Sequence, residues 1–168
     1  MTGISIRPFA AVDGQALVSI LRPVFQAGDT YAIDPGITDE AAIKYWCAPD
    51  HIVHVAERDE TILGTYYLRR NQGGGGAHVC NCGYVTATAA RGQGVARAML
   101  AHSLDQARAQ QYRAMQFNFV VSSNAPAIRL WQRAGFEIVG RIPQAFQHPA
   151  HGYVDAYIMW KDLTATYP

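Results

Sequence analysis

Arg91-Gly92-Gln93-Gly94-Val95-Ala96 is the stretch of this chain that constrains its architecture most. It follows a run rich in strand-forming residues, 79–86, and precedes a segment whose apolar residues recur at the spacing of one helical face. Glycines let a backbone approach a ligand closely, and the first amides of a helix lack intrahelical partners. The helix dipole and the Arg91 side chain add favourable charge for an anion. This arrangement predicts a pocket for a pyrophosphate group.

Length and composition indicate one globular domain. A chain of 168 residues, 49% of them hydrophobic, can bury a substantial core, so we expect a single domain over residues 1–168. The formal net charge of +1, without a Lys/Arg run, gives no basic field for nucleic acid. The sequence has no membrane-length apolar stretch, no signal-peptide pattern at its N-terminus, and an odd number of cysteines, three. We therefore expect a cytoplasmic protein that binds neither nucleic acid nor membrane.

Hydrophobic periodicity predicts how strands and helices alternate along the chain. Strands are expected at residues 4–9, 52–57, 62–69, 79–86, 115–121, 136–141 and 153–160. Helices are expected after Asp13, from Thr38 to Trp46, at 95–111, and from Asn124 to Gly135. Asp13 is expected to cap the first helix, Pro23 to kink or end it, and residues 143–151 to form a loop. The order β-α-α-β-β-β-α-β-α-β-β is that of a mixed α/β domain.

Two asparagines stand out in strands that are otherwise largely apolar. Asn81 lies in the strand 79–86 and Asn118 in the strand 115–121, and neither strand contains Asp, Glu or Lys. Asparagine can orient an amine or bind a carboxylate, but it is not an ordinary general base. Two interpretations stay open: hydrogen bonds within the sheet, or orientation of a substrate.

Other polar residues are weaker candidates for a functional role. We interpret four of these residues as exposed charges or loop histidines, or as partners in a structural hydrogen bond: Glu57, His148, His151 and Asp155. Cys80 and Cys82 share a strand face, but zinc sites of this type use a wider spacing and two further ligands. We therefore expect no metal.

Two motifs together resemble one enzyme family. The pattern Gln/Arg-x-x-Gly-x-Gly/Ala is met by Arg91, Gly94 and Ala96. The pattern Asn-x-x-Ala-x-x-Leu-x-x-x-x-Gly-Phe begins 33 residues after Arg91 and is met by Asn124, Ala127, Leu130, Gly135 and Phe136. With this element order, the chain resembles the GNAT-type N-acetyltransferases, which depend on acetyl-CoA. The resemblance implies a single-domain α/β GNAT fold, with a mixed, mostly antiparallel sheet of about six to seven strands flanked by about four helices.

The resemblance also implies which residues hold acetyl-CoA. Beside Arg91, the pyrophosphate would be bound by the backbone amides of Gly92, Gln93, Gly94, Val95, Ala96 and Arg97. Tyr84, Val85 and Thr86 would lie along the pantetheine arm, which pairs with them as an added strand does. An amide of Val85 or Thr86 would face the thioester carbonyl. Asn124 would contact the cofactor arm while it caps its helix.

One position departs from the family pattern. Many members carry a tyrosine that protonates the departing thiolate at the position where this chain has Trp131. An indole N–H is not a useful acid, so we interpret Trp131 as packing against the cofactor or the core. A closer resemblance, to fungal acetyltransferases of azetidine-2-carboxylate and proline-like amines, is carried by residues 117–121, Asn124 and 128–131. It implies that Asn81 and Asn118 bind and position the substrate.

These features predict an N-acetyltransferase that transfers acetyl from acetyl-CoA to the amine of a small molecule by direct attack on the thioester. An amino acid or proline-like analogue is the favoured acceptor, and Tyr31 is a candidate wall of its pocket. The alternatives are transfer to another small amine or to a protein N-terminus, and a non-catalytic acyl-CoA-binding sensor. Dimerisation is common in this superfamily, so we also expect a homodimer.

Overall fold

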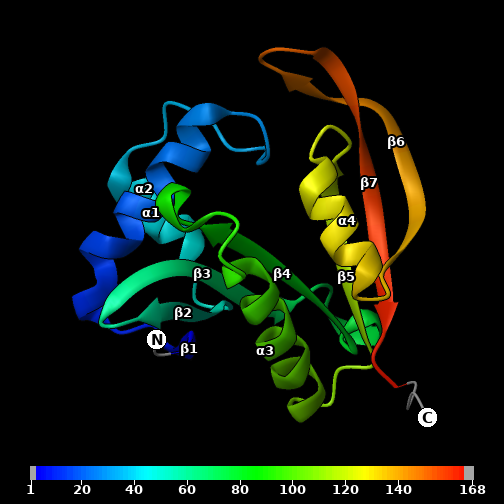
Figure 1. Cartoon of the computed structure of the whole chain (residues 1–168). Coiled ribbons are helices and arrows are strands. Elements are labelled where there is room, and N and C mark those ends of the chain that lie inside the picture. The colour runs from blue at the N-terminus through cyan, green and yellow to red at the C-terminus, as the bar shows by residue number, and fades with distance from the viewer. Residues whose placement is uncertain (1–2, 165–168) are drawn as a thin grey trace.

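One mixed sheet of seven strands, in the order β1-β2-β3-β4-β5-β7-β6, organises the chain (Figure 1). The computed structural model describes residues 3–164, so both ends of the predicted domain 1–168 lie outside the described residues. The strands are β1 Ser5–Pro8, β2 Ile52–Arg58, β3 Thr61–Arg70, β4 Val79–Thr86, β5 Ala114–Val121, β6 Glu137–His148 and β7 Gly152–Asp162. The helices are α1 Gly14–Ala27, α2 Asp39–Trp46, α3 Val95–Ala109 and α4 Ala125–Arg133. The predicted order of elements is confirmed.

The first helix begins directly after Asp13, as predicted, but it differs from the prediction in its cap and in its length. The Asp13 side chain does not cap α1, because its carboxylate accepts hydrogen bonds from Arg7 on β1, at 2.7 and 2.9 Å, and from Ala10 N at 2.8 Å. The Arg7 hydrogen bonds lower the pKa of this carboxyl below its ordinary value. The helix does not end at Pro23, which is exposed, but continues to Ala27. Burial of the apolar stripe that ends at Phe25 accounts for the continuation.

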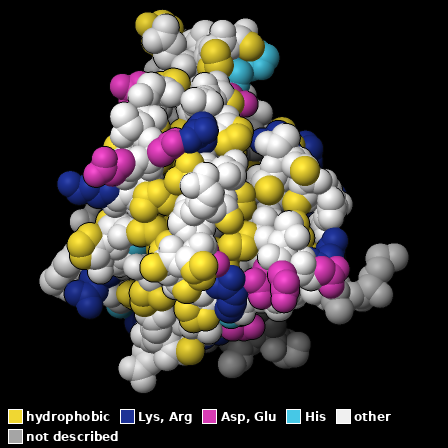
Figure 2. Space-filling view, turned by 90° about the vertical axis from the view of Figure 1, so that its left-hand side faces the viewer, with side chains coloured by type: hydrophobic (Ala, Val, Ile, Leu, Met, Phe, Trp, Pro, Cys, Tyr) yellow, Lys and Arg dark blue, Asp and Glu magenta, His cyan; other side chains and the backbone are white. Residues whose placement is uncertain are grey.

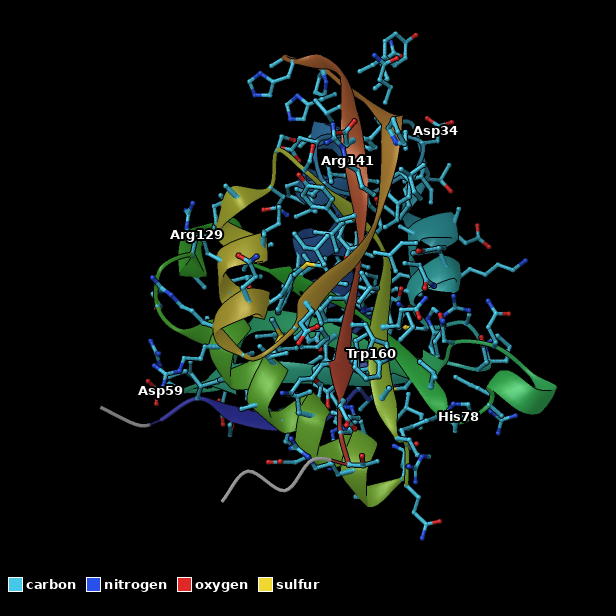
Figure 3. All side chains as sticks on the ribbon, turned by 90° about the vertical axis from the view of Figure 1, so that its right-hand side faces the viewer. Asp34, Asp59, His78, Arg129, Arg141 and Trp160 are labelled. Atoms are coloured by element: carbon cyan, nitrogen blue, oxygen red, sulfur yellow. The ribbon has the colours of Figure 1, made fainter. Side chains whose placement is uncertain are left out.

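The last two strands form a longer hairpin than predicted, because residues 143–148, expected as loop, belong to β6. The register of β6 against β7 shifts between Ile142 and Phe146, and Gln144 adopts a φ of 50° within that irregularity. Asp155 stabilises this irregular segment. Its carboxylate accepts a hydrogen bond from Gln144 N at 2.9 Å and forms an ion pair with Arg141. The structural role expected for Asp155 is thus confirmed. Its partner Arg141, which belongs to β6, is labelled in Figure 3.

Helices cover both faces of the sheet, and each face has its own hydrophobic core. On one face the buried side chains of β3, β4 and β5 pack against α3 and α4. This core includes Met115 of β5, Met99 of α3 and Trp131 of α4. On the other face Tyr67 packs with α1 and α2 around the fully buried Trp46. Figure 2 shows acidic and basic side chains interspersed on the face that it presents. Within residues 3–164, no helix is both long and apolar enough to cross a membrane.

The sheet splits in its middle, between β4 and β5. These strands run parallel but pair only at Val79↔Ala114 and Cys80↔Met115, and then separate (Figure 1). Beyond that point β4 continues against β3, while β5 continues against β7. One edge of β4 is therefore not paired with a neighbouring strand over most of its length, in the centre of the sheet.

Candidate active site

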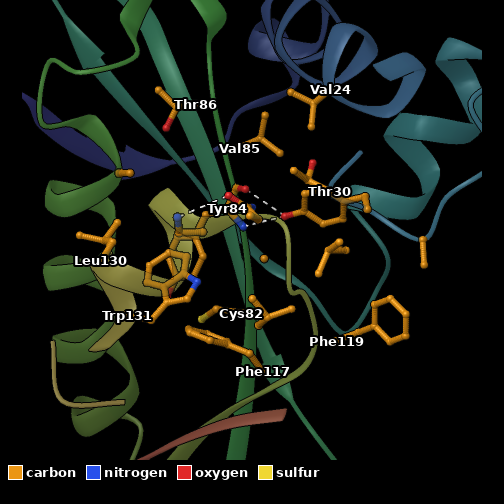
Figure 4. Close-up of a pocket in the computed structure, with 18 of the residues that line it drawn as sticks. Val24, Thr30, Cys82, Tyr84, Val85, Thr86, Phe117, Phe119, Leu130 and Trp131 are labelled. Atoms are coloured by element: carbon orange, nitrogen blue, oxygen red, sulfur yellow. Dashed lines mark hydrogen bonds between the residues drawn. The ribbon is translucent and has the colours of Figure 1, made fainter. Parts of the chain in front are cut away.

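The separation of β4 and β5 opens a cleft of about 610 Å³ through the middle of the molecule (Figure 4). One end is lined by Thr86, Arg91 and Ala96, where β4 leads into α3, and by α4. The other end is lined by the loop after α1, by Tyr45 of α2, and by Tyr67 of β3. The cleft therefore connects the start of α3 on one face of the sheet with the α1–α2 region on the other.

The glycine turn has the geometry expected of an anion pocket. Gly92 and Gly94 have φ values of 77° and 83°, a left-handed conformation that disfavours residues with a Cβ. The bond from Ala98 N to Gly94 O, 3.0 Å, begins the α3 ladder, so helix geometry leaves the amides of Val95, Ala96 and Arg97 available to a ligand. Of the residues predicted to hold the pyrophosphate, Arg91 and Ala96 line the cleft itself, and the others lie along the same turn and first helical turn.

The free edge of β4 presents the polar groups of every second residue. In an antiparallel pair, residues alternate between bonding the partner strand and facing away from it. Val79 O accepts from Asn71 N at 2.9 Å, and Ala87 N donates to Leu63 O at 2.8 Å, so odd-numbered residues face β3. Even-numbered residues therefore present their amides to the cleft. Of the two amides expected to face the thioester, that of Val85 is directed at its partner Thr65 on β3, so only the Thr86 alternative stays a prediction.

Tyr31 lies against this free edge. Its hydroxyl donates to Tyr84 O at 2.9 Å and accepts from Tyr84 N at 3.0 Å (dashed lines at Tyr84 in Figure 4). Phe25 and Trp46 hold the Tyr31 ring at centroid distances of 5.5 and 6.0 Å. Burial raises the pKa of the Tyr31 phenol well above its ordinary value, so it stays protonated. Tyr31 thus lines the cleft and occupies both cleft-facing backbone groups of Tyr84, and its contact with a substrate stays a prediction.

The α4 side of the cleft is aromatic. Trp131 is 8% exposed and packs on Tyr84 and Phe117 at centroid distances of 5.0 and 5.1 Å, which confirms its interpretation as a packing residue. Asn124 Oδ1 accepts from Ala127 N at 3.4 Å, which confirms the predicted cap, and Asn124 also lines the cleft. Its contact with the cofactor arm stays a prediction.

Asn81 and Asn118 line the cleft where β4 and β5 separate, and each is hydrogen-bonded to the protein. Asn81 Nδ2 donates to Gln116 O at 2.9 Å, across the point at which the strands part. Asn118 Oδ1 accepts from Gln116 Nε2 at 2.9 Å, and its Nδ2 donates to Asn71 Oδ1 at 2.7 Å. The first of the two open interpretations, hydrogen bonds within the sheet, is therefore present for both asparagines, and substrate contact stays a prediction.

Sequence reasoning missed two charged residues of the cleft, Arg69 and Asp29. Arg69 Nε donates to Asn81 Oδ1 at 3.4 Å, and Asp29 lines the cleft from the loop after α1. The alternation of β3 was the available signal for Arg69, because it puts this residue on the same face as Tyr67. In the part of the chain that the structure describes, the cleft lining contains none of the four weaker candidates: Glu57, His148, His151 and Asp155.

The site is thus a sheet split between two parallel strands, with a glycine-led helix start at one end of the opening. The sequence model of the acetyltransferase (GNAT) family matches residues 15–136, and the chain belongs to this family.

Individual proteins agree with that membership. A GCN5-related N-acetyltransferase from Kribbella flavida is 40% identical with a TM-score of 0.89, over 95% of this chain and 97% of that one. The N-acetyltransferase aca1 of Schizosaccharomyces pombe is 31% identical over 150 residues, which are 79% of this chain and 72% of aca1. A phosphinothricin acetyltransferase from Sinorhizobium meliloti, solved with acetyl-CoA, shares the fold at 21% identity and a TM-score of 0.82, over 98% of this chain and 92% of that one.

Proposed function

We propose that this protein transfers the acetyl group of acetyl-CoA to the amine of a small molecule. The observation that carries the proposal is the unpaired edge of β4, which leads from the polar cluster around Asn81 to the glycine turn at α3. An extended, amide-containing arm that ends in phosphate matches both features, because the strand edge offers amides and carbonyls and the helix start offers amides to an anion. The phosphinothricin acetyltransferase of the same fold contains acetyl-CoA.

The cleft-facing backbone groups of Cys82, Tyr84 and Thr86 would pair with the pantetheine arm. Those of Tyr84 are bonded to the Tyr31 hydroxyl, so the arm would displace that hydroxyl to use them. Arg91 would then face the pyrophosphate together with the amides of residues 92 and 94–97, whereas the Gln93 amide donates to Ala90 O at 3.3 Å. Trp131 would cover the arm from α4.

Direct attack of the amine on the thioester fits the side chains of the cleft better than a two-step reaction through cysteine. Cys82 is the cleft-lining thiol among the described residues, and burial raises its pKa well above the ordinary value, so it remains a poor nucleophile. The amine nitrogen would form a bond to the carbonyl carbon while a backbone amide stabilises the charge on the oxygen. The carbon–sulfur bond then breaks, CoA leaves as the thiolate, and the amine loses its proton to water.

We further propose that the acceptor is an amino acid or proline-like analogue such as azetidine-2-carboxylate. Asn81 and Asn118 would position it, since both line the cleft and Asn81 lies opposite Arg69, on the sheet face that also carries Tyr67. Each side-chain amide nitrogen has two N–H groups, and the structure commits one of them, so each retains a donor for the substrate.

The test is the release of free CoA thiol from acetyl-CoA in the presence of a panel of amines. The panel contains azetidine-2-carboxylate, proline, primary amino acids, simple polyamines and a peptide with a free N-terminus. Acceleration by amino acids supports the proposal, whereas acceleration only by the polyamines or the peptide favours the other acceptors. Binding of acetyl-CoA without acceleration by any amine would instead support an acyl-CoA sensor and contradict catalysis.

A homodimer and a cytoplasmic location complete the proposal. Strand β6 lies at the edge of the sheet and exposes Ile138, Val139 and Ile142, at 41, 56 and 38%, which suits contact with a second copy. Size-exclusion chromatography with light scattering distinguishes a dimer from a monomer. Cell fractionation tests the location.

A further inference from the structure

Arg69 brings a positive charge to the acceptor end of the cleft. Among the described residues that line the cleft, the cations are Arg69 and Arg91. Arg91 lies at the glycine turn, past the end of β4, whereas Arg69 is paired with Asn81 near the start of β4. The five residue-to-residue steps from Asn81 to Thr86 span about 16 Å of strand, too far for one anionic group to contact both guanidinium groups. The two arginines therefore serve different ligand groups.

The guanidinium of Arg69 is positioned by the protein and is only weakly paired with a carboxylate of it. Its Nε donates to Asn81 Oδ1 at 3.4 Å, and Asn81 in turn holds Gln116 O at 2.9 Å, so one hydrogen-bonded chain joins β3, β4 and β5. The nearest carboxylate is that of Asp50, whose Oδ2 lies 3.7 Å from Arg69 Nη1 and whose side chain is 61% exposed. An ion pair this long and this exposed is weak. Within residues 3–164, most of the five N–H groups of Arg69 have no hydrogen-bond partner.

The surroundings of Arg69 suit a small ligand that carries a carboxylate. Arg69 shares its sheet face with Tyr67, and both line the cleft with Asn81 and Asn118. Asp29, the carboxylate among the described lining residues, lies in the loop after α1, two residues before Tyr31, whose hydroxyl bonds Tyr84. Arginine binds carboxylates through a planar fork of donors, which an asparagine amide cannot match in charge.

We propose that Arg69 binds the carboxylate of the acceptor and thereby makes the enzyme selective for amino-acid-like amines over neutral ones. The proposal rests on the proposed amine acetyltransferase function and names the substrate class of the same site. Asn81 then acts as a positioning residue for the guanidinium in addition to any contact of its own. Loss of a charge-assisted hydrogen bond of this kind weakens binding roughly 10- to 100-fold.

The experiment compares azetidine-2-carboxylate with azetidine-2-carboxamide, two acceptors that differ in the carboxylate alone. In Arg69→Gln the KM for the carboxylate should rise roughly 10- to 100-fold, while the KM values for the carboxamide and for acetyl-CoA change less than about threefold. Arg69→Lys keeps the charge but loses the fork, so its KM should fall between those of the wild type and Arg69→Gln. Arg108→Gln is the matched control, because Arg108 is an exposed arginine of α3 outside the cleft. Equal changes for both acceptors in both Arg69 variants, or no change for either, overturn the proposal.

A binding measurement separates failure of this proposal from failure of the proposed function. Calorimetry with CoA present measures the affinity for azetidine-2-carboxylate without turnover. Binding that Arg69→Gln weakens supports the role of Arg69 even where no acetyl group is transferred. Turnover in which the wild type shows no carboxylate preference overturns the role of Arg69 and leaves the acetyltransferase function standing. Absence of both binding and turnover overturns both.

Discussion

Replacement of Tyr31 by phenylalanine should make acetyl-CoA bind more tightly. The Tyr31 hydroxyl bonds Tyr84 O at 2.9 Å and Tyr84 N at 3.0 Å, and these are two of the backbone groups that the pantetheine arm would use. Each such bond contributes about 0.5–1.5 kcal/mol net, and water replaces part of this in the variant. We expect a gain of about 1.4 kcal/mol in binding, which is roughly a tenfold lower Kd. The ring itself stays packed between Phe25 and Trp46.

The assay is calorimetric titration of acetyl-CoA into the two proteins, with the thermal unfolding midpoint measured in parallel. The free variant should be less stable than the wild type by about 1–3 kcal/mol, because the two hydrogen bonds are lost. Tyr153→Phe is the control, since Tyr153 is 67% exposed on β7 and lies outside the cleft. Unchanged or weaker acetyl-CoA binding in Tyr31→Phe would refute the reasoning. It would mean that the arm does not compete with the Tyr31 hydroxyl, or that this hydroxyl helps to hold the cofactor.

Two further predictions concern stability. Gly83→Ala should lower the free energy of unfolding by about 1–3 kcal/mol, because the added Cβ would meet the Tyr67 side chain at 2.5–2.9 Å. Gly75→Ala is the control and should change the free energy of unfolding little, because a Cβ there has no atom within 4 Å. Thermal denaturation compares the two variants. Asp13→Asn should cost about 1–3 kcal/mol at pH 7 because the Arg7 guanidinium loses the buried one of its two anionic partners, Asp13 and Glu57. The folded pKa of Asp13 is lowered, so its contribution is complete above the ordinary value of 3.8 and is lost as the pH falls through the lower folded pKa. Denaturation curves of wild type and variant should therefore converge in acid, and a constant difference down to low pH would contradict the assignment.

The fold could be predicted from local signals, and the errors lie where distant residues decide the outcome. The strand before Arg91, the helix after Gly94 and the cap at Asn124 each depend on residues close in sequence, and each is present. Residues 143–148 look like a loop locally, but pairing with β7 and the hydrogen bond from Gln144 N to Asp155 keep them in the strand. Tertiary contact outweighs local preference at such positions.

For the same reason, only the anion pocket of the candidate site could be predicted from the sequence. The anion pocket is contained in one short motif, so spacing and residue type reveal it. The contact of Tyr31 with Tyr84 joins residues 53 positions apart, and the contact of Arg69 with Asn81 depends on the register of β3 against β4. Neither the register nor the path of the loop after α1 can be inferred from residue type, so the positions of Arg69 and Tyr31 in the cleft could not be predicted from the sequence.

The central claim is that the cleft between β4 and β5 transfers an acetyl group from acetyl-CoA directly to an amine. Mass spectrometry after incubation with isotope-labelled acetyl-CoA and azetidine-2-carboxylate tests this most directly, because it follows the acetyl group itself. We predict labelled N-acetyl product and free CoA in equal amounts, with no label on Cys82. Label recovered only as acetate, or retained on the protein, would contradict the account.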